Sequence, residues 1–240
     1  MLKNTQGLVL RNIKYGETSI ISTLYTKDFG MQAYLIRGAR SNKKTGIKAN
    51  YFQIGQFLDV TVYHKPGKNL QYIREVKLNA DHAIQSQHIV KQSITQFCSE
   101  LILRCVKEEE QNETLYNFLA SFFSRVKELK KEDLALAPIK FTLLFSAKIG
   151  FEINNNYSDE RPHFDALNGE FCSEISTNSY CSKRAPSALI FNCIKDKDSA
   201  PSEQSERELA LHDLLRFLKL HIEQMSEMKS VGILHQILHD

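Results

Sequence analysis

Basic side chains gather between residues 37 and 48, and no acidic residue interrupts them. The cluster consists of Arg37, Arg40, Lys43, Lys44 and Lys48. Cationic groups this close together can neutralise successive phosphates of a nucleic acid and release the counterions bound there. Other basic residues on neighbouring strands or turns could extend this phosphate-binding cluster, namely Arg11, Lys14, Lys65, Lys68 and Arg74. The pattern predicts a phosphate-binding surface, with a solvated basic face as the alternative.

Two aromatic residues lie in the segment 57–64, whose sequence alternates between apolar and polar positions. Leu58, Val60 and Val62 face one side, and Phe57, Asp59, Thr61 and Tyr63 face the other. Phe57 and Tyr63 are therefore predicted to stack on bases, a contact that contributes ~1–3 kcal/mol per base. The alternative is that both rings pack against the helices that follow.

Charge is unevenly distributed along the 240 residues, whose formal net charge is +3. Residues 1–80 contain 13 Lys and Arg against four Asp and Glu, a charge of +9, whereas residues 81–240 contain 18 against 24, a charge of −6. This split predicts an anionic partner for the first part of the chain only. Nucleic acid is favoured over a membrane surface, because the sequence has no basic amphipathic helix of the kind that binds membranes.

No motif in the sequence indicates an enzyme. The phosphate-binding loop G-x-x-x-x-G-K-[ST], the dinucleotide turn G-x-G-x-x-G, the motif H-E-x-x-H and the elbow G-x-S-x-G are all absent. His235 and His239 have the i, i+4 spacing of metal ligands, but no third ligand accompanies them, so we interpret them as exposed. Cys98 and Cys105 fall on an apolar stripe and are interpreted as core residues.

A second group of metal-ligating residue types consists of His163, Cys172 and Cys181. They lie in an irregular segment where a metal could replace a weak core. Structural zinc sites draw their ligands in close pairs from tight turns, and here the spacings are nine and nine residues. The sequence therefore predicts no zinc and no other cofactor.

The five cysteines are an odd number, and the first residues lack the apolar core of a signal peptide. No apolar run approaches the roughly 18–20 residues needed to cross a bilayer. We therefore expect reduced thiols and a cytoplasmic location.

Short strands must position the basic and aromatic residues of the first part. Five segments rich in β-forming residues and bounded by turn residues occur at 7–16, 18–26, 31–39, 57–64 and 70–78. So many short strands within about 75 residues suit a closed barrel, which leaves no exposed edge. The five-stranded OB-fold is the predicted architecture.

Helical periodicity replaces this pattern after residue 81. The apolar stripes span 90–105, 115–129 with Asn112 as N-cap, 134–149 ending at Gly150, and 211–225 behind a capping box formed by Ser205 and Glu208. A hairpin is predicted around Gly169 and an exposed loop at 195–205. The fold class is α+β, with an OB-fold domain at 1–80 and a helical domain at 81–240 that carries an irregular insertion at 151–194.

Several motifs in the first part resemble the amino-terminal domain of the RecO family of bacterial recombination mediators. They are Gly7-Leu-Val-Leu, Tyr15-Gly16-Glu17-Thr18, Leu24-Tyr-Thr26, Phe29-Gly30, Ile36-Arg37-Gly38-Ala39-Arg40 and Gly67-Lys68-x-Leu70, followed by a strand with Glu75. The helical half, with a helix ending in Ile149-Gly150-Phe151 and an irregular insertion, matches in pattern. The resemblance covers essentially the whole chain.

The resemblance implies an OB-fold that binds single- and double-stranded DNA without sequence preference and anneals complementary strands. It also implies partnership with the single-strand-binding protein and with RecR, in order to load the RecA recombinase, without cofactor or nucleotide hydrolysis. Many family members hold zinc in the insertion with two C-x-x-C pairs. This chain has only the isolated Cys172 and Cys181, so the zinc module is expected to be degenerate and its hairpin to be held by packing.

The single-strand-binding protein ends in an acidic tail with a terminal apolar residue, and the family receives it in the helical domain. A receiving site needs an apolar groove with a cation at its mouth. The segment 140–148 matches this description, with Lys140 and Lys148 as cations and Phe141 and Leu144 lining the groove. The alternatives are that these apolar residues belong to the core, and that the protein is an adaptor whose basic barrel binds acidic protein tails and not DNA.

Overall fold

A computed structural model of the chain describes residues 1–41, 46–79, 88–107, 110–174, 180–196, 202–223 and 225–239. The chain divides into two compact units, residues 1–128 and residues 129–240. The predicted domain boundary at residues 80 and 81 falls in 80–87, outside the described residues, and the two helices that follow it group with the barrel in the first unit.

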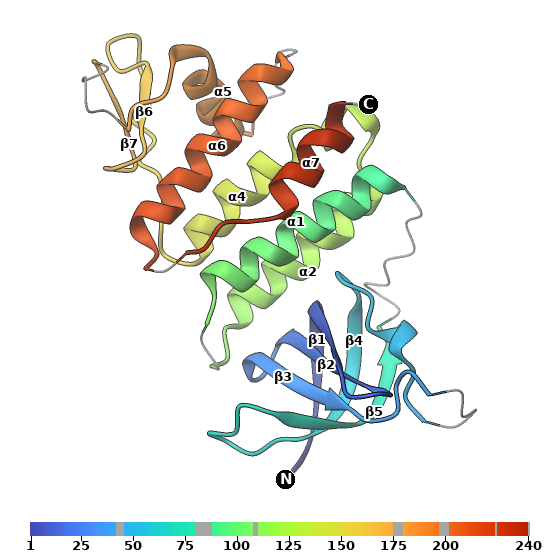
Figure 1. The fold of residues 1–240 in the computed structure, drawn as a ribbon. Coiled ribbons are helices and arrows are strands. Elements are labelled where there is room, and N and C mark those ends of the chain that lie inside the picture. The colour runs from blue at the N-terminus through green and yellow to red at the C-terminus, as the bar shows by residue number, and fades with distance from the viewer. Residues whose placement is uncertain are drawn as a thin grey trace. The chain divides into compact units, whose positions relative to one another are not determined.

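Five strands form a closed barrel with the spatial order β1-β2-β3-β5-β4 (Figure 1). They are β1 (Leu2–Tyr15), β2 (Ser19–Thr26), β3 (Gly30–Ile36), β4 (Phe57–Tyr63) and β5 (Gln71–Leu78). The first half of β1 pairs with β4 and the second half with β2, which closes the barrel. The predicted five-stranded OB-fold barrel is confirmed, although β1 begins five residues earlier and β3 ends three residues earlier than predicted.

The seam between β3 and β5 differs from the other four. It is parallel and contains only two register pairs, Tyr34 with Gln71 and Leu35 with Tyr72. The other strand pairs are antiparallel and have six to eight register pairs each. Parallel pairing over so short a length makes this seam the weakest in the barrel.

The barrel core follows from strand alternation. Leu58, Val60 and Val62 of β4 point inward as predicted, and they meet Leu24 of β2 and Tyr34 of β3. The turn between β4 and β5 contains Pro66 and Gly67, and Gly67 has φ of +72°, which a residue with a side chain rarely adopts. A short 3-10 turn, η1 (Ala49–Tyr51), follows β3.

The part of the first unit that the structure describes also contains the helices α1 (Ile89–Cys105), which contacts β1, and α2 (Glu113–Glu128). The predicted N-cap of α2 is confirmed, because Asn112 Oδ1 accepts the backbone N–H of Leu115 at 2.9 Å. The apolar face of α2 covers one outward side chain of the barrel, Phe57, whose ring meets Tyr116 and Phe123 edge-on with centroids 6.2 and 6.0 Å away.

Within the described residues, the second unit contains five helices and a two-stranded hairpin. They are α3 (Lys131–Leu134), α4 (Ala137–Lys148), β6 (His163–Asp165), β7 (Glu170–Cys172), α5 (Arg184–Ile194), α6 (Gln204–His221) and α7 (Ser230–His239). The predicted hairpin around Gly169 is confirmed. The helix predicted at 134–149 is present as α4, which begins three residues later because Ala135 and Leu136 form a turn after α3.

The start of α6 corrects two further predictions. Glu203 and Glu206 form the capping box, in place of Ser205 and Glu208, so residues 204 and 205 belong to the helix and not to the predicted loop. At the other end, α6 stops at His221, although Met225 is buried as the apolar stripe predicts.

Candidate nucleic-acid interface

An exposed aromatic pair lies across β4 and β5, beside the weak seam. Tyr63 and Tyr72 are cross-strand partners, so their rings leave the same face of the sheet, and they are 47% and 38% exposed. The guanidinium carbon of Arg37, just after β3, lies 5.3 Å from the centre of the Tyr72 ring. This cation–π contact holds a positive charge next to an exposed stacking surface. We call Arg37, Tyr63 and Tyr72 the aromatic strip.

Gln71 shapes the turn next to this strip. Its side chain is 2% exposed, accepts the N–H of Lys65 at 3.0 Å, and donates to the carbonyls of Lys65 and Lys68 at 2.8 and 2.9 Å. One buried amide thus fixes the turn while both lysine side chains stay exposed. The interpretation of the sequence missed Tyr72 and Gln71; the placement of Tyr72 opposite Tyr63 would have required the strand register.

The basic residues predicted to bind phosphate divide into two groups. Arg11, Lys14, Arg37, Lys65, Lys68 and Arg74 are exposed on the barrel, with Arg74 lying 3.6 Å from Glu75. Arg40 and Lys48 are half-buried: Arg40 donates to the carbonyls of Ser19 and Gly16 at 3.2 and 2.7 Å, and Lys48 donates to the carbonyl of Ser41 at 3.1 Å.

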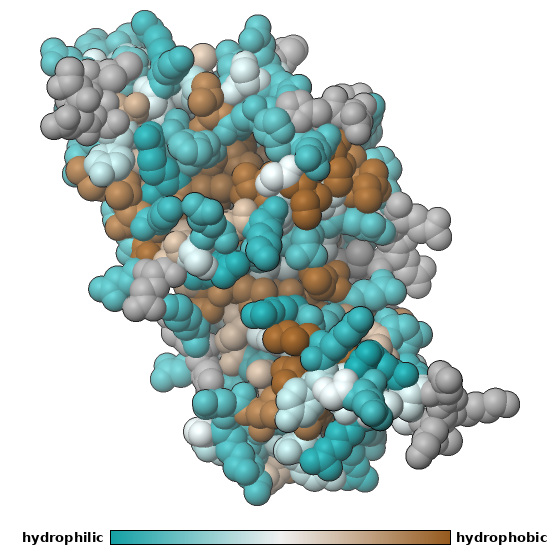
Figure 2. All heavy atoms as spheres, viewed as in Figure 1, coloured by the Kyte–Doolittle hydropathy of each residue, from teal (hydrophilic) through white to brown (hydrophobic). Residues whose placement is uncertain are grey.

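Arg40 therefore ties the segment after β3 to the turn between β1 and β2. Lys43 and Lys44 lie outside the described residues. Hydrophilic side chains cover much of the barrel surface visible at the lower end of Figure 2, with apolar side chains between them.

Phe57 is not available to stack on a base. It is wholly buried beneath Tyr116 and Phe123 of α2, which is the alternative that the sequence left open. Phe57 lies on the side of β4 that the sequence predicted to be exposed, but the amphipathic α2 covers that side at Phe57 and buries its ring. Of the two aromatic residues predicted on this strand, only Tyr63 is exposed.

The segment predicted to receive an acidic tail forms α4. Phe141 is wholly buried and stacks on Phe145 with centroids 5.3 Å apart, so it is a core residue. Lys140, Leu144 and Lys148 recur every fourth residue and share one helix face, on which Leu144 is 50% exposed. The Lys140 ammonium forms an ion pair with Asp196 at 2.9 Å.

An apolar pocket lies between α4, α6 and α7 in the same unit. Its walls include Ile139, Leu211, Leu215, Leu234 and Leu238, and Arg207 and His212 also line it. On its border the His235 imidazole lies 3.0 Å from the Glu208 carboxylate. The pocket has apolar walls next to a cation, whereas the ring of Phe141 lies in the core.

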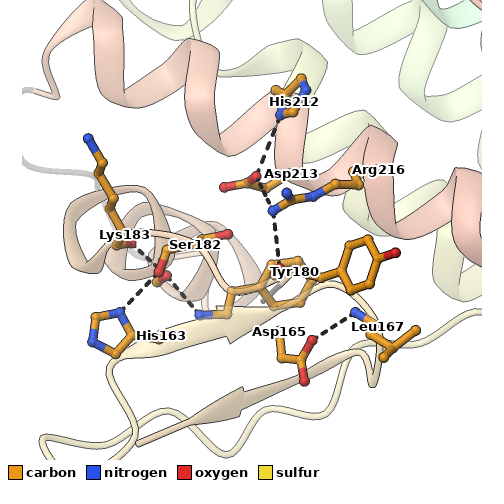
Figure 3. Close-up of polar contacts among 11 residues, drawn as sticks. His163, Asp165, Leu167, Tyr180, Ser182, Lys183, His212, Asp213 and Arg216 are labelled. Carbon is orange, nitrogen blue, oxygen red and sulfur yellow. Dashed lines mark hydrogen bonds and ion pairs between the residues drawn. The ribbon is translucent and has the colours of Figure 1, made fainter. Parts of the chain in front are cut away.

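The insertion is held by aromatic packing and by polar contacts to α6. Phe164 and Phe171 of the hairpin are buried, and the Phe164 ring lies 6.1 Å from that of Phe217 in α6. Arg216 donates to the Tyr180 carbonyl at 3.1 Å and to the buried Asp213 at 2.8 Å, as Figure 3 shows.

The three residues considered for zinc do not form a ligand set. His163 contacts the Ser182 carbonyl through Nδ1 at 3.0 Å (Figure 3), and the sulfurs of Cys172 and Cys181 lie 3.3 Å apart. Among the described residues, no group of three or more His, Cys, Asp or Glu side chains could hold a metal ion. None of the described helices is long and apolar enough to cross a membrane.

A closed five-stranded barrel in which β3 and β5 pair in parallel defines an OB-fold protein. Two family models match the chain, "Recombination protein O N terminal" over residues 1–80 and "Recombination protein O C terminal" over residues 86–158. The chain belongs to the RecO family, whose members are non-enzymatic recombination mediators.

Full-length relatives agree with this assignment. DNA repair protein RecO of Christiangramia forsetii is 28% identical over 241 residues, covering 99% of both chains. The RecO of Flavobacterium psychrophilum is 26% identical over 237 residues, covering 97% of this chain and 98% of the relative. That of Azobacteroides pseudotrichonymphae is 25% identical over 241 residues, covering 99% of both. The prediction that the chain is not an enzyme agrees with membership of this family.

Proposed function

We propose that the protein binds single- and double-stranded DNA without sequence specificity and anneals complementary strands. The observation that carries the proposal is the aromatic strip with Lys65 and Lys68 on the adjoining turn. Bases stack on Tyr63 and Tyr72, while Arg37 and the lysines neutralise phosphates. Neither contact reads a base edge, so binding tolerates any sequence.

Salt dependence of binding tests this proposal. Fluorescence anisotropy of labelled single-stranded DNA is measured across a salt series for the wild type and for Arg37→Ala/Lys65→Ala/Lys68→Ala. For single strands the slope of log K against log salt is negative, and each lost phosphate contact reduces its magnitude by about 0.7, so the triple variant should be about 2 less steep. The matched control removes three exposed charges elsewhere, Arg125→Ala/Lys131→Ala/Lys219→Ala, and should keep the wild-type slope.

An equal loss of slope in both triple variants would contradict the assignment of the phosphate track to this end of the barrel. Absence of DNA binding at low salt would favour the alternative adaptor, in which the basic barrel captures acidic protein tails with a shallow salt dependence.

In the cell, we propose that the protein acts with RecR to load RecA on strands coated with the single-strand-binding protein, at the bacterial nucleoid in the cytoplasm. It requires no cofactor, no nucleotide hydrolysis and no zinc. The acidic tail of the single-strand-binding protein would place its terminal apolar residue in the pocket between α4, α6 and α7, with its carboxylate near Arg207. The pocket replaces the groove that the sequence predicted at Phe141, because the ring of Phe141 is buried.

Binding of a labelled tail peptide distinguishes the two positions. Arg207→Glu should abolish binding if the pocket receives the tail, and Lys140→Glu should do so if the outward face of α4 receives it. Binding that survives both substitutions would contradict a tail site in this unit.

A further inference from the structure

Two thiols meet in the insertion, next to β6. Cys172 lies at the end of β7 opposite His163, and Cys181 forms an isolated bridge with Asp165. The backbone N–H of Ser182 donates to the Phe164 carbonyl at 2.7 Å, so the segment that carries Cys181 is anchored to β6 as well. The two sulfur atoms lie 3.3 Å apart, and both residues are partly exposed.

We propose that Cys172 and Cys181 are an oxidation site that forms an intramolecular disulfide on reaction with hydrogen peroxide. A disulfide needs a sulfur–sulfur distance of about 2.05 Å, so the two sulfur atoms, now 3.3 Å apart, must move closer to form it. Strand pairing with β6 already holds the backbones of both cysteines in place, so the two thiols stay near each other in the folded protein.

The chemistry has two steps. One sulfur attacks peroxide, breaks the O–O bond, becomes a sulfenic acid and releases water; the second sulfur then displaces the hydroxyl group as a second water and forms the S–S bond. The two thiols lose two electrons and two protons in total, and one peroxide becomes two waters. Burial, followed by the neighbouring Cys181, raises the pKa of Cys172 to about 12, so the short sulfur–sulfur distance, and not an activated thiol, favours the disulfide.

The other three cysteines provide internal controls. Cys98 and Cys193 are buried, and burial raises the pKa of Cys98 well above its usual value. Burial also raises the pKa of Cys105 to about 12. Burial should slow the reaction of these thiols with peroxide in the folded protein, whereas the two sulfur atoms of the insertion are partly exposed and 3.3 Å apart.

Peptide mapping of the full chain tests the proposal. The reduced protein is treated with hydrogen peroxide, its remaining thiols are blocked with N-ethylmaleimide in denaturant, and it is cleaved after glutamate. Glu174 lies between the two cysteines, so cleavage separates Cys172 from Cys181 unless a disulfide joins their peptides. The expected product is a linked pair of peptides, two hydrogen atoms lighter than their sum, which separates on reduction with dithiothreitol.

Two variants sharpen the result. Cys193→Ser should leave the linked peptides in place, and Cys172→Ser should abolish them. Oxidised wild type should also unfold at a higher temperature than the reduced form, a difference that Cys172→Ser removes. Recovery of Cys172 and Cys181 as separately blocked peptides, or their linkage to other cysteines, would overturn the proposal; the wild-type measurement decides even if the variant fails to fold.

Discussion

Phe57 and Tyr63 occupy the two ends of one strand, yet only Tyr63 reaches the surface. Phe57→Ala should lower the free energy of unfolding by about 3–5 kcal/mol, because it opens a cavity beneath Tyr116 and Phe123. Urea denaturation measures the loss. The matched control, Tyr63→Ala, should change stability little and weaken binding to single-stranded DNA by ~1–3 kcal/mol. The opposite pattern would mean that Phe57 contacts DNA.

Two buried phenols predict how stability depends on alkaline pH. Tyr34 and Tyr116 are buried, with hydroxyl groups that have no hydrogen-bond partner among the described residues. Burial raises the pKa of both well above the ordinary value of 10.0. The unfolded chain loses these protons near pH 10 while the folded chain keeps them. The contribution of these two protonated phenols to the free energy of unfolding is therefore fully present below pH 10, and it is lost as the pH rises above 10.

The loss of stability due to each tyrosine should steepen above pH 10 and approach a limit of about 1.4 kcal/mol per pH unit. The free energy of unfolding is measured by denaturation of the wild type and of Tyr34→Phe between pH 9 and 11. The difference between the two pH dependences is due to the Tyr34 hydroxyl, since every other titrating group is common to both proteins. Equal slopes for the two proteins would show that the Tyr34 ring is accessible to water.

At the scale of elements, the attachment of the insertion to α6 depends on Arg216. Arg216→Ala should lower the free energy of unfolding by about 3 kcal/mol, because it leaves the buried Asp213 without its closest cation. Arg184→Ala is the matched control: its ion pair with Asp159 is exposed on both sides, so its loss should leave the thermal midpoint almost unchanged.

Metal removal gives a separate test at the same scale. Dialysis against EDTA should leave the thermal midpoint of the wild type unchanged, because aromatic packing and the contacts of Arg216 hold the hairpin. A lower midpoint that zinc restores would contradict the proposal that the insertion needs no metal.

The strands could be predicted from sequence because each is short, alternating and bounded by turn residues, as β4 illustrates. The helix α5 was missed because Pro186 resembles a helix breaker, although in the first turn of a helix its missing N–H costs nothing. The helix α7 was missed because its few turns at the chain end gave too short a stripe. The aromatic strip could be predicted only in part, because it depends on a cross-strand register that no local pattern contains.

At the scale of the whole molecule, the first unit should fold as residues 1–128 and not as the barrel alone. A chain ending at residue 79 exposes Phe57 to water and loses the ion pair of Lys27 with Glu113, whose charged atoms lie 3.1 Å apart. Size-exclusion chromatography and near-UV circular dichroism should show a folded monomer for 1–128 and an aggregating or loosely packed chain for 1–79. A well-packed 1–79 monomer would contradict this expectation.

The two-pair seam between β3 and β5 also governs how the barrel opens transiently. Amide hydrogens along this seam should exchange with deuterium faster than those between β1 and β2, because fewer bonds must break together. Arg37 and Tyr72 lie on opposite sides of it. A DNA strand bound to both would hold the two sides of the seam together from outside. Slower amide exchange at Leu35 and Tyr72 would then report directly that DNA is bound to the barrel, without any label on the DNA.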